Sequence, residues 1–332
     1  MKFGQLALAG SACLLSSCGG GGSGGGVAST PIPPPPPPSP AYSSLMNPVA
    51  SIFHTSSTQE SIRRYANDWN SVRELNASSS PVSTGITVDY QPANGKYILS
   101  DGSSTVEFDQ SHGGTPSYPG GPISYVKPIP SSVVGETDYE HLFIYNDKQP
   151  QFTTTYSSII WWASNRVGTV NPTPSSGLAT RYTNRFATIG YETVSSDIPR
   201  TGFAGYNGLM VGVYTKNGDI SLPPTDPNRG YVASIQGNAI IDVNFATGSV
   251  SPRMDIYITD VPTANVTGAG TIGAGTSRFS GTLISANPNT NGTFQGGFYG
   301  PRAVEIGYDF LLNHEGGVVT GAVVGKSAAA GN

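Results

Sequence analysis

The chain of 332 residues is poor in charge, histidine and cysteine. Charged residues make up 11% of it, against about 25% in an ordinary soluble protein. Its net charge is −4 and it has no cluster of lysine and arginine, so nothing indicates a nucleic-acid partner. The four histidines, His54, His112, His141 and His314, have no spacing typical of a metal-ligand pair. The few histidines therefore give catalysis little support and indicate no metal site.

Both cysteines, Cys13 and Cys18, lie near the N-terminus, which leaves the rest of the chain without a disulfide or a thiolate metal site. Residues 1–17 resemble an export signal, with one cation, Lys2, before an apolar stretch from Leu6 to Leu15. This stretch is shorter than the roughly 20 apolar residues that a helix needs to span a bilayer. Leu15-Ser16-Ser17-Cys18 matches a bacterial lipobox, in which the cysteine becomes the acylated N-terminus. We expect lipidation at Cys18, the alternative being an ordinary signal peptide with an incidental cysteine.

A low-complexity segment follows Cys18. Residues 19–26 are nearly all glycine and form a flexible coil, whereas Pro33 to Pro38 form an unbroken proline run that adopts stiff polyproline II. Together they predict a tether that holds a folded body away from a membrane.

The rest of the chain has the composition of an all-β body. The whole chain has 43 glycines and 17 tyrosines, which suits many short strands joined by glycine turns. A transmembrane barrel shares this composition, but a protein that spans the membrane needs no acyl anchor, and evenly long alternating strands are not visible. The Gly/Pro/Ser-rich stretch 113–130 is interpreted as a loop.

One segment has a helical pattern. Ser57-Thr58-Gln59-Glu60 has the spacing of a capping box, and apolar residues follow at helical intervals: Ile62, Tyr65, Trp69, Val72 and Leu75. We expect an amphipathic helix whose aromatic stripe packs on the β body.

Two runs in the second half carry a family resemblance. The first, after the Asp-x-Pro turn at 197–199, is Thr-Gly-x-Ala-x-Tyr-x-Gly, with Gly202, Tyr206 and Gly208. The second is Gly292 to Gly307, and its motif residues are Gly296, Phe298, Tyr299, Gly300, Pro301 and Glu305. Tyr-Gly-Pro gives a corner that cannot continue a sheet ladder. From roughly residue 80 to 326 the chain resembles transferrin-binding protein B and related bacterial surface lipoproteins.

The resemblance implies an all-β fold with an N-terminal β-rich handle, one attached helix and a C-terminal eight-stranded antiparallel barrel. Eight strands give a lumen that side chains fill. We expect barrel strands near 202–214, 231–245, 254–259, 265–270, 278–285, 293–299, 304–312 and 317–324. The predicted parts are a signal peptide 1–17, a lipidated tether 18–41, a helical segment 42–80, a handle-like subdomain 81–197, the barrel 198–326 and a tail 327–332.

Two places are candidate partner-binding sites. The connection between Tyr214 and Tyr231 is long for a hairpin, and long ordered loops tend to be functional, although a disordered insertion is an equal alternative. Its charged candidates are Lys216, Asp219, Asp226 and Arg229. Adjacent tryptophans in a strand point to opposite faces, so one ring joins the core and the other is a candidate anchor. Trp161, Trp162 and Arg166 complete the candidate set.

The family resemblance also implies a function. It indicates a lipid-anchored protein of the outer membrane, exposed at the cell surface, that binds an iron- or haem-carrying protein, or haem, and presents it to a membrane transporter. No cofactor follows from the residues, since seventeen tyrosines offer haem ligands without indicating one. A surface adhesin or host-protein decoy without an iron role is the alternative, and a structural envelope lipoprotein is a third.

Overall fold

The computed structural model describes residues 41–45, 49–65, 68–116, 121–145, 154–169, 178–223, 225–226, 228–258 and 261–328. The predicted signal peptide, Cys18 and the tether lie outside these residues. The described part of the chain is all-β, as expected, and contains no α-helix. Correspondingly, no helix among the described residues is long and apolar enough to cross a bilayer.

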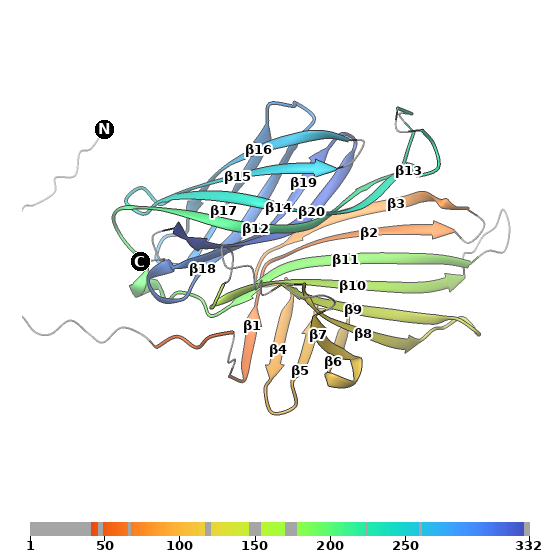
Figure 1. Ribbon diagram of the computed structural model, residues 1–332, viewed down its shortest axis with the longest axis horizontal. Coiled ribbons are helices and arrows are strands. Elements are labelled where there is room, and N and C mark those ends of the chain that lie inside the picture. The colour runs from red at the N-terminus through yellow and green to blue at the C-terminus, as the bar shows by residue number, and fades with distance from the viewer. Residues whose placement is uncertain are drawn as a thin grey trace, which may run out of the picture. The chain divides into compact units, whose positions relative to one another are not determined.

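Eight antiparallel strands close into the predicted barrel, in the order β12-β14-β15-β16-β17-β18-β19-β20 (Figure 1). Their bounds are β12 Phe203–Lys216, β14 Tyr231–Asn244, β15 Ser249–Ile258, β16 Val261–Ile272, β17 Arg278–Ser285, β18 Asn291–Tyr299, β19 Glu305–His314 and β20 Gly317–Ser327. Each corresponds to one of the eight expected strands.

Buried apolar residues alternate with exposed polar residues along the barrel strands, so the apolar side chains fill the lumen. In β14 the side chains of Ile241 and Val243 are buried, whereas Asp242 between them is exposed. Large rings from several strands meet inside, among them Tyr206, Phe298 and Tyr308. The barrel therefore has a packed core, as expected for eight strands.

A second set of strands forms what we call the long sheet, in the order β13-β3-β2-β11-β10-β9-β8-β7 (Figure 1). Its strands are β13 Gly218–Asp219, β3 Asp68–Ser80, β2 Ser57–Tyr65, β11 Leu178–Gly190, β10 Ser157–Thr169, β9 Thr137–Tyr145, β8 Ile123–Pro130 and β7 Gly113–Pro116. One face of this sheet packs against β12 and β20 of the barrel through Ile159, Phe186, Val211 and Val324.

The other face of the long sheet packs on a small sheet of order β1-β4-β5-β6. Its strands are β1 Ser51–His54, β4 Thr87–Gln91, β5 Lys96–Ser100 and β6 Thr105–Phe108. Leu142 and Trp162 of the long sheet meet Val88, Leu99 and Phe108 there, all fully buried. Short 3₁₀ turns complete the described elements: η1 Gln110–His112, η2 Ser195–Asp197 and η3 Pro301–Ala303.

The predicted helix over residues 57–75 is wrong, because this segment forms β2 and β3. The two strands pair with each other, and β2 pairs in register with β11 from Thr58 to Tyr65. From Thr58 onward the buried residues of β2 are Thr58, Glu60 and Ile62, which is a period of two. A neighbouring strand supplies backbone partners that local spacing does not reveal, so tertiary pairing overrode the helical pattern.

The predicted loop over 113–130 is also wrong in part, since it contains β7 and β8. Pro128 and Pro130 lie opposite Tyr139 and Thr137 of β9, on a strand that β7 covers only at residues 123–125. Proline is tolerated on such an edge because the missing N–H faces away from the ladder.

Candidate functional site

The β12–β14 connection, residues 217–230, joins the barrel to the long sheet. Directly after β12 the chain forms β13, in which Gly218 pairs with Val72 and Asp219 with Ser71 of β3. Ile220 N donates to the Asn70 carbonyl at 2.6 Å, and Leu75 N donates to Asn217 Oδ1 at 3.2 Å. The connection is thus attached to the edge of the long sheet.

Short polar side chains shape this connection. Asp219 Oδ1 accepts from the N–H and the hydroxyl of Ser221 at 2.8 and 2.7 Å, and these bonds lower the pKa of Asp219. Asp226 Oδ1 accepts from Asn228 N at 2.8 Å in the same way. Gly218 has φ +138°, a conformation that glycine adopts without strain. These turns and the β13 pairing define the backbone of the described residues of the connection.

Of the predicted residues, the structure brings together Asp219, Asp226 and Arg229, since Arg229 N donates to the Asp226 carbonyl at 3.0 Å and a β-bridge joins Asp219 to Arg229, whereas Lys216 ends β12 opposite Tyr231. The Arg229 guanidinium lies 4.6 Å from the centroid of the Tyr231 ring, and Asp219 and Arg229 form an isolated bridge. A polar cleft of about 600 Å³ lies between the connection and β3. Its lining includes Arg73, Glu74, Asn217, Asp219 and Asn228. This cleft offers charged groups of both signs.

The tryptophans lie elsewhere, on opposite faces of β10. Trp162 is fully buried under the small sheet, and its Nε1 donates to Glu140 at 2.6 Å. Trp161 is half-buried on the barrel side, stacks with Phe186 at 5.5 Å and donates to Asn184 Oδ1 at 2.9 Å. Arg166, farther along the same strand, forms an ion pair with Glu140.

Two motif residues of the run from Gly292 to Gly307 attach the barrel to the long sheet. Tyr299 OH lies 3.1 Å from Thr188 Oγ1 of β11. Glu305 is buried, and its carboxylate accepts from Tyr156 N at 2.9 Å, from Ser157 Oγ at 2.8 Å and from Thr155 N. Burial raises the pKa of Glu305, against the effect of these donors. The sequence indicated a corner here and gave no sign of this contact.

The other motif residues form the corners and the core of the barrel. Tyr206 OH donates to the Ala303 carbonyl at 2.6 Å, and the Phe298 ring packs 5.2 Å from Phe279. Gly202 and Gly300 lie at turns and have φ of +89° and +71°. Pro301 begins η3. At Gly208 and Gly296 an added Cβ would meet the adjacent strand.

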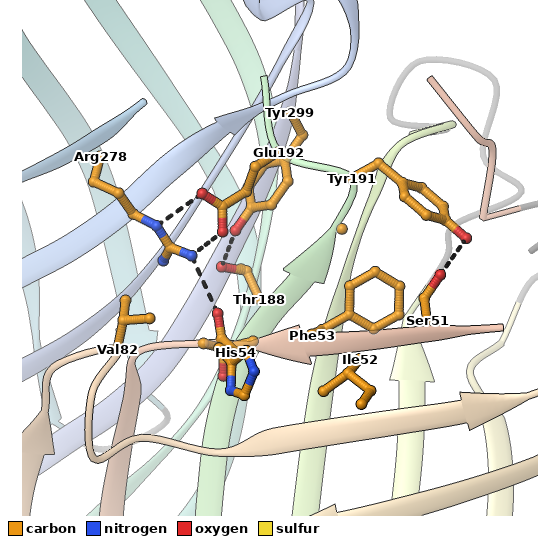
Figure 2. A pocket seen from close by; sticks show the side chains of 12 residues that line it. Ser51, Ile52, Phe53, His54, Val82, Thr188, Tyr191, Glu192, Arg278 and Tyr299 are labelled. Carbon is orange, nitrogen blue, oxygen red and sulfur yellow. Dashed lines mark hydrogen bonds and ion pairs between the residues drawn. The ribbon is translucent and has the colours of Figure 1, made fainter. Parts of the chain in front are cut away.

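A second cleft, of about 610 Å³, lies beside β1 (Figure 2). Arg278 of β17 forms a two-point ion pair with Glu192 and donates to the His54 carbonyl at 3.1 Å. Tyr191 OH lies 3.2 Å from Ser51 Oγ on the other side of the cleft. These contacts already use the cleft's ionic groups, so it offers apolar and hydroxyl surface rather than a free charge.

Buried acids between barrel and long sheet were not predicted. Asp309 of β19 is fully buried, and burial raises its pKa to about 7. It accepts from Ser56 Oγ and, at 3.3 Å, from Gln295 Nε2. Within the described residues no three His, Cys, Asp or Glu side chains gather as a metal site.

The protein is thus a barrel with the long sheet packed against its wall. The buried polar side chains Tyr299, Glu305 and Asp309 lie where the barrel and the long sheet meet. Residues 198–327, which include all eight barrel strands, match the family described as C-lobe and N-lobe beta barrels of Tf-binding protein B. The predicted resemblance is confirmed over this range and stays a prediction for residues 80–197.

Similar solved structures include the N-lobe of lactoferrin-binding protein B of Moraxella bovis, with 17% identity, a TM-score of 0.37, and 56% of this chain and 79% of that chain covered. Transferrin-binding protein B of Neisseria meningitidis has 16% identity and a TM-score of 0.40, over 81% of this chain and 43% of that chain. The protein of that name from Haemophilus parasuis, a double mutant, has 14% identity and a TM-score of 0.36, over 84% and 76%. No curated protein matches the chain.

Proposed function

We propose that this protein is a non-catalytic lipoprotein, anchored in the outer membrane through Cys18 and exposed at the cell surface. It binds an iron- or haem-carrying protein, or haem, and presents it to a membrane transporter. The observation that carries this proposal is the match of residues 198–327 to the barrels of Tf-binding protein B. The lipobox and the Gly/Pro tether support the anchor.

The β12–β14 connection is the surface that we assign to the partner. It is held to β3 by β13 and by the Ile220 N–Asn70 O bond, so docking costs less conformational entropy than it would for a free loop. Asp219 and Arg229, with Lys216 at the adjoining end of β12, give it charges of both signs, which suits a protein surface with its own polar rim.

The first test measures the abundance of the protein in outer-membrane fractions with and without an iron chelator, by quantitative mass spectrometry. We expect strong induction when iron is scarce. An unchanged level would contradict the iron role and favour the adhesin or decoy alternative.

The second test addresses the surface. Immobilised protein is offered iron-loaded transferrin and lactoferrin, haemoglobin and free haem, and each bound species is quantified. Lys216→Glu, at the last residue of β12 beside the connection, should weaken capture by about tenfold, the loss of one good charged contact. Lys326→Glu is the matched control, because Lys326 pairs with Asn207 near the opposite end of β12. Equal loss in both variants would contradict the assignment of the connection.

A further inference from the structure

Four arginines from four neighbouring strands stand opposite one another across the long sheet. Arg73 of β3 pairs with Arg63 of β2, Arg63 with Arg181 of β11, and Arg181 with Arg166 of β10. Directly opposed residues of antiparallel strands point to the same face. Since neighbouring strands lie about 4.8 Å apart, this arginine row extends over roughly 14 Å.

The row lies on the face that carries the small sheet, beyond the area that this sheet covers. On β10, Trp162 belongs to the same face as Arg166 and is fully buried under the small sheet. The β5–β6 turn reaches only to Arg185, whose Nε lies 2.8 Å from Asp101 Oδ2. Arg181, four residues earlier on β11, is exposed.

Local carboxylates neutralise part of the row. Arg63 Nη1 lies 2.9 Å from Glu74 Oε1. Arg166 pairs with Glu140 and lies 3.9 Å from Asp138. Arg181, between Arg63 and Arg166, has no hydrogen bond or ion pair in the described part of the chain. Like charges directly opposite each other destabilise a sheet, so folding does not explain an unpaired arginine at this position.

We propose that the arginine row binds an acidic segment of a partner protein, with a partner carboxylate bound by Arg181. Carboxylates of this chain already bind Arg63 and Arg166, the arginines on either side of Arg181. The row therefore suits carboxylates, which a guanidinium group can bind at two points. The exposed carboxylate of Glu74 lies beside the row and would repel a flat anionic membrane, whereas a single carboxylate side chain reaches Arg181. This surface meets the polar cleft of the β12–β14 connection at Arg73 and Glu74, but its central residue, Arg181, lies two strands away on β11. The proposal does not depend on an iron role.

The test uses the purified protein and a fluorescent peptide of about twelve alternating glutamate and serine residues, in a buffer of about 10 mM salt where screening is weak. Fluorescence anisotropy measures its binding. A glutamine–serine peptide tests for charge, and vesicles with anionic phospholipid test the membrane as the source of negative charge. We expect the acidic peptide alone to bind.

Arg181→Gln should weaken binding of the acidic peptide by about tenfold, the loss of one charge-assisted contact. It should leave the melting temperature unchanged or raise it, because a like-charge repulsion is removed. Arg253→Gln is the matched control, since Arg253 is an exposed arginine on β15 that pairs with Asp242 at 2.6 Å. The affinity of Arg253→Gln for the acidic peptide should equal that of the unmodified protein.

Several outcomes would overturn the proposal. These are no binding of the acidic peptide, equal binding of the glutamine peptide, stronger binding to vesicles, or equal effects of the two arginine variants. A melting temperature lowered by Arg181→Gln would also overturn it, because Arg181 would then serve the fold. Failure of the iron test leaves all these readouts unaffected, so the two proposals fail separately.

Discussion

The buried carboxyl group of Asp309 makes the stability of this protein depend on pH in a direction opposite to that of an ordinary paired acid. Asp309 is fully buried where β19 faces the long sheet, and its contacts are the Ser56 hydroxyl and the Gln295 amide. The substitution Asp309→Asn keeps the shape and an acceptor oxygen and removes the charge.

The sign follows from proton binding. Burial raises the pKa of Asp309 from 3.8 to about 7 in the folded protein. Between these values the folded state holds a proton that the unfolded state has released, so the free energy of unfolding decreases as pH rises. The contribution of Asp309 is complete below about pH 4 and is lost as pH passes through 7. About three pKa units at 1.36 kcal/mol each give about 4 kcal/mol.

Urea unfolding at several pH values between about 4 and 8 measures this effect. The free energy of unfolding of Asp309→Asn, relative to the unmodified protein, should rise over this range by up to about 4 kcal/mol. Asp242→Asn, at an exposed position on the outside of the barrel, should show no such rise. If the difference between Asp309→Asn and the unmodified protein does not change with pH, the reasoning about Asp309 is refuted.

Two further substitutions test the packing of the barrel and its junction with the long sheet. Glu305→Ala should lower the free energy of unfolding by about 3–5 kcal/mol, because two backbone N–H groups, including that of Tyr156, lose a buried acceptor; a loss below about 1 kcal/mol would mean that water replaces the carboxylate. Gly296→Ala should cost about 1–3 kcal/mol, since the added methyl group meets the Gly307 carbonyl and Tyr308 of the adjacent strand β19. Gly168→Ala, where a Cβ meets open space, is its control, and equal costs in urea unfolding would contradict this account.

The barrel was predictable because its signals are local. Alternation in β14 and the glycine-rich motif before Pro301 indicate strands and corners from neighbouring residues alone, and the expected strand 278–285 coincides with β17. Ends were less predictable where a strand continues into polar residues. β15, for example, begins at Ser249 rather than near Met254, because pairing with β14 extends it.

The long sheet was less predictable because its partners are distant in sequence. β2 pairs with β11 more than a hundred residues away, and its helical spacing carries no trace of that partner. The β12–β14 connection was recognised by its length, whereas its attachment to Ser71 and Val72 depends on that same sheet. The arginine row could not be predicted for the same reason, since Arg63 and Arg181 become neighbours only through strand register.

The outward face of β19 explains why the junction was missed as well. Glu305, Gly307 and Asp309 alternate with buried Ile306 and Tyr308, which is the pattern of a barrel strand with one face in water. The long sheet and the segment beside it cover that face. Glu305 bonds residues 155–157, an added Cβ at Gly307 would lie 3.1 Å from Thr188, and Asp309 bonds Ser56. Acidic residues at alternate positions of a strand can therefore lie either on a solvent-exposed face or at a buried polar junction. Only contacts with residues distant in sequence distinguish the two cases. Because this junction holds the long sheet against the barrel, the β12–β14 connection and the arginine row are presented on one compact unit, residues 39–332, and a partner can contact both surfaces without first ordering them.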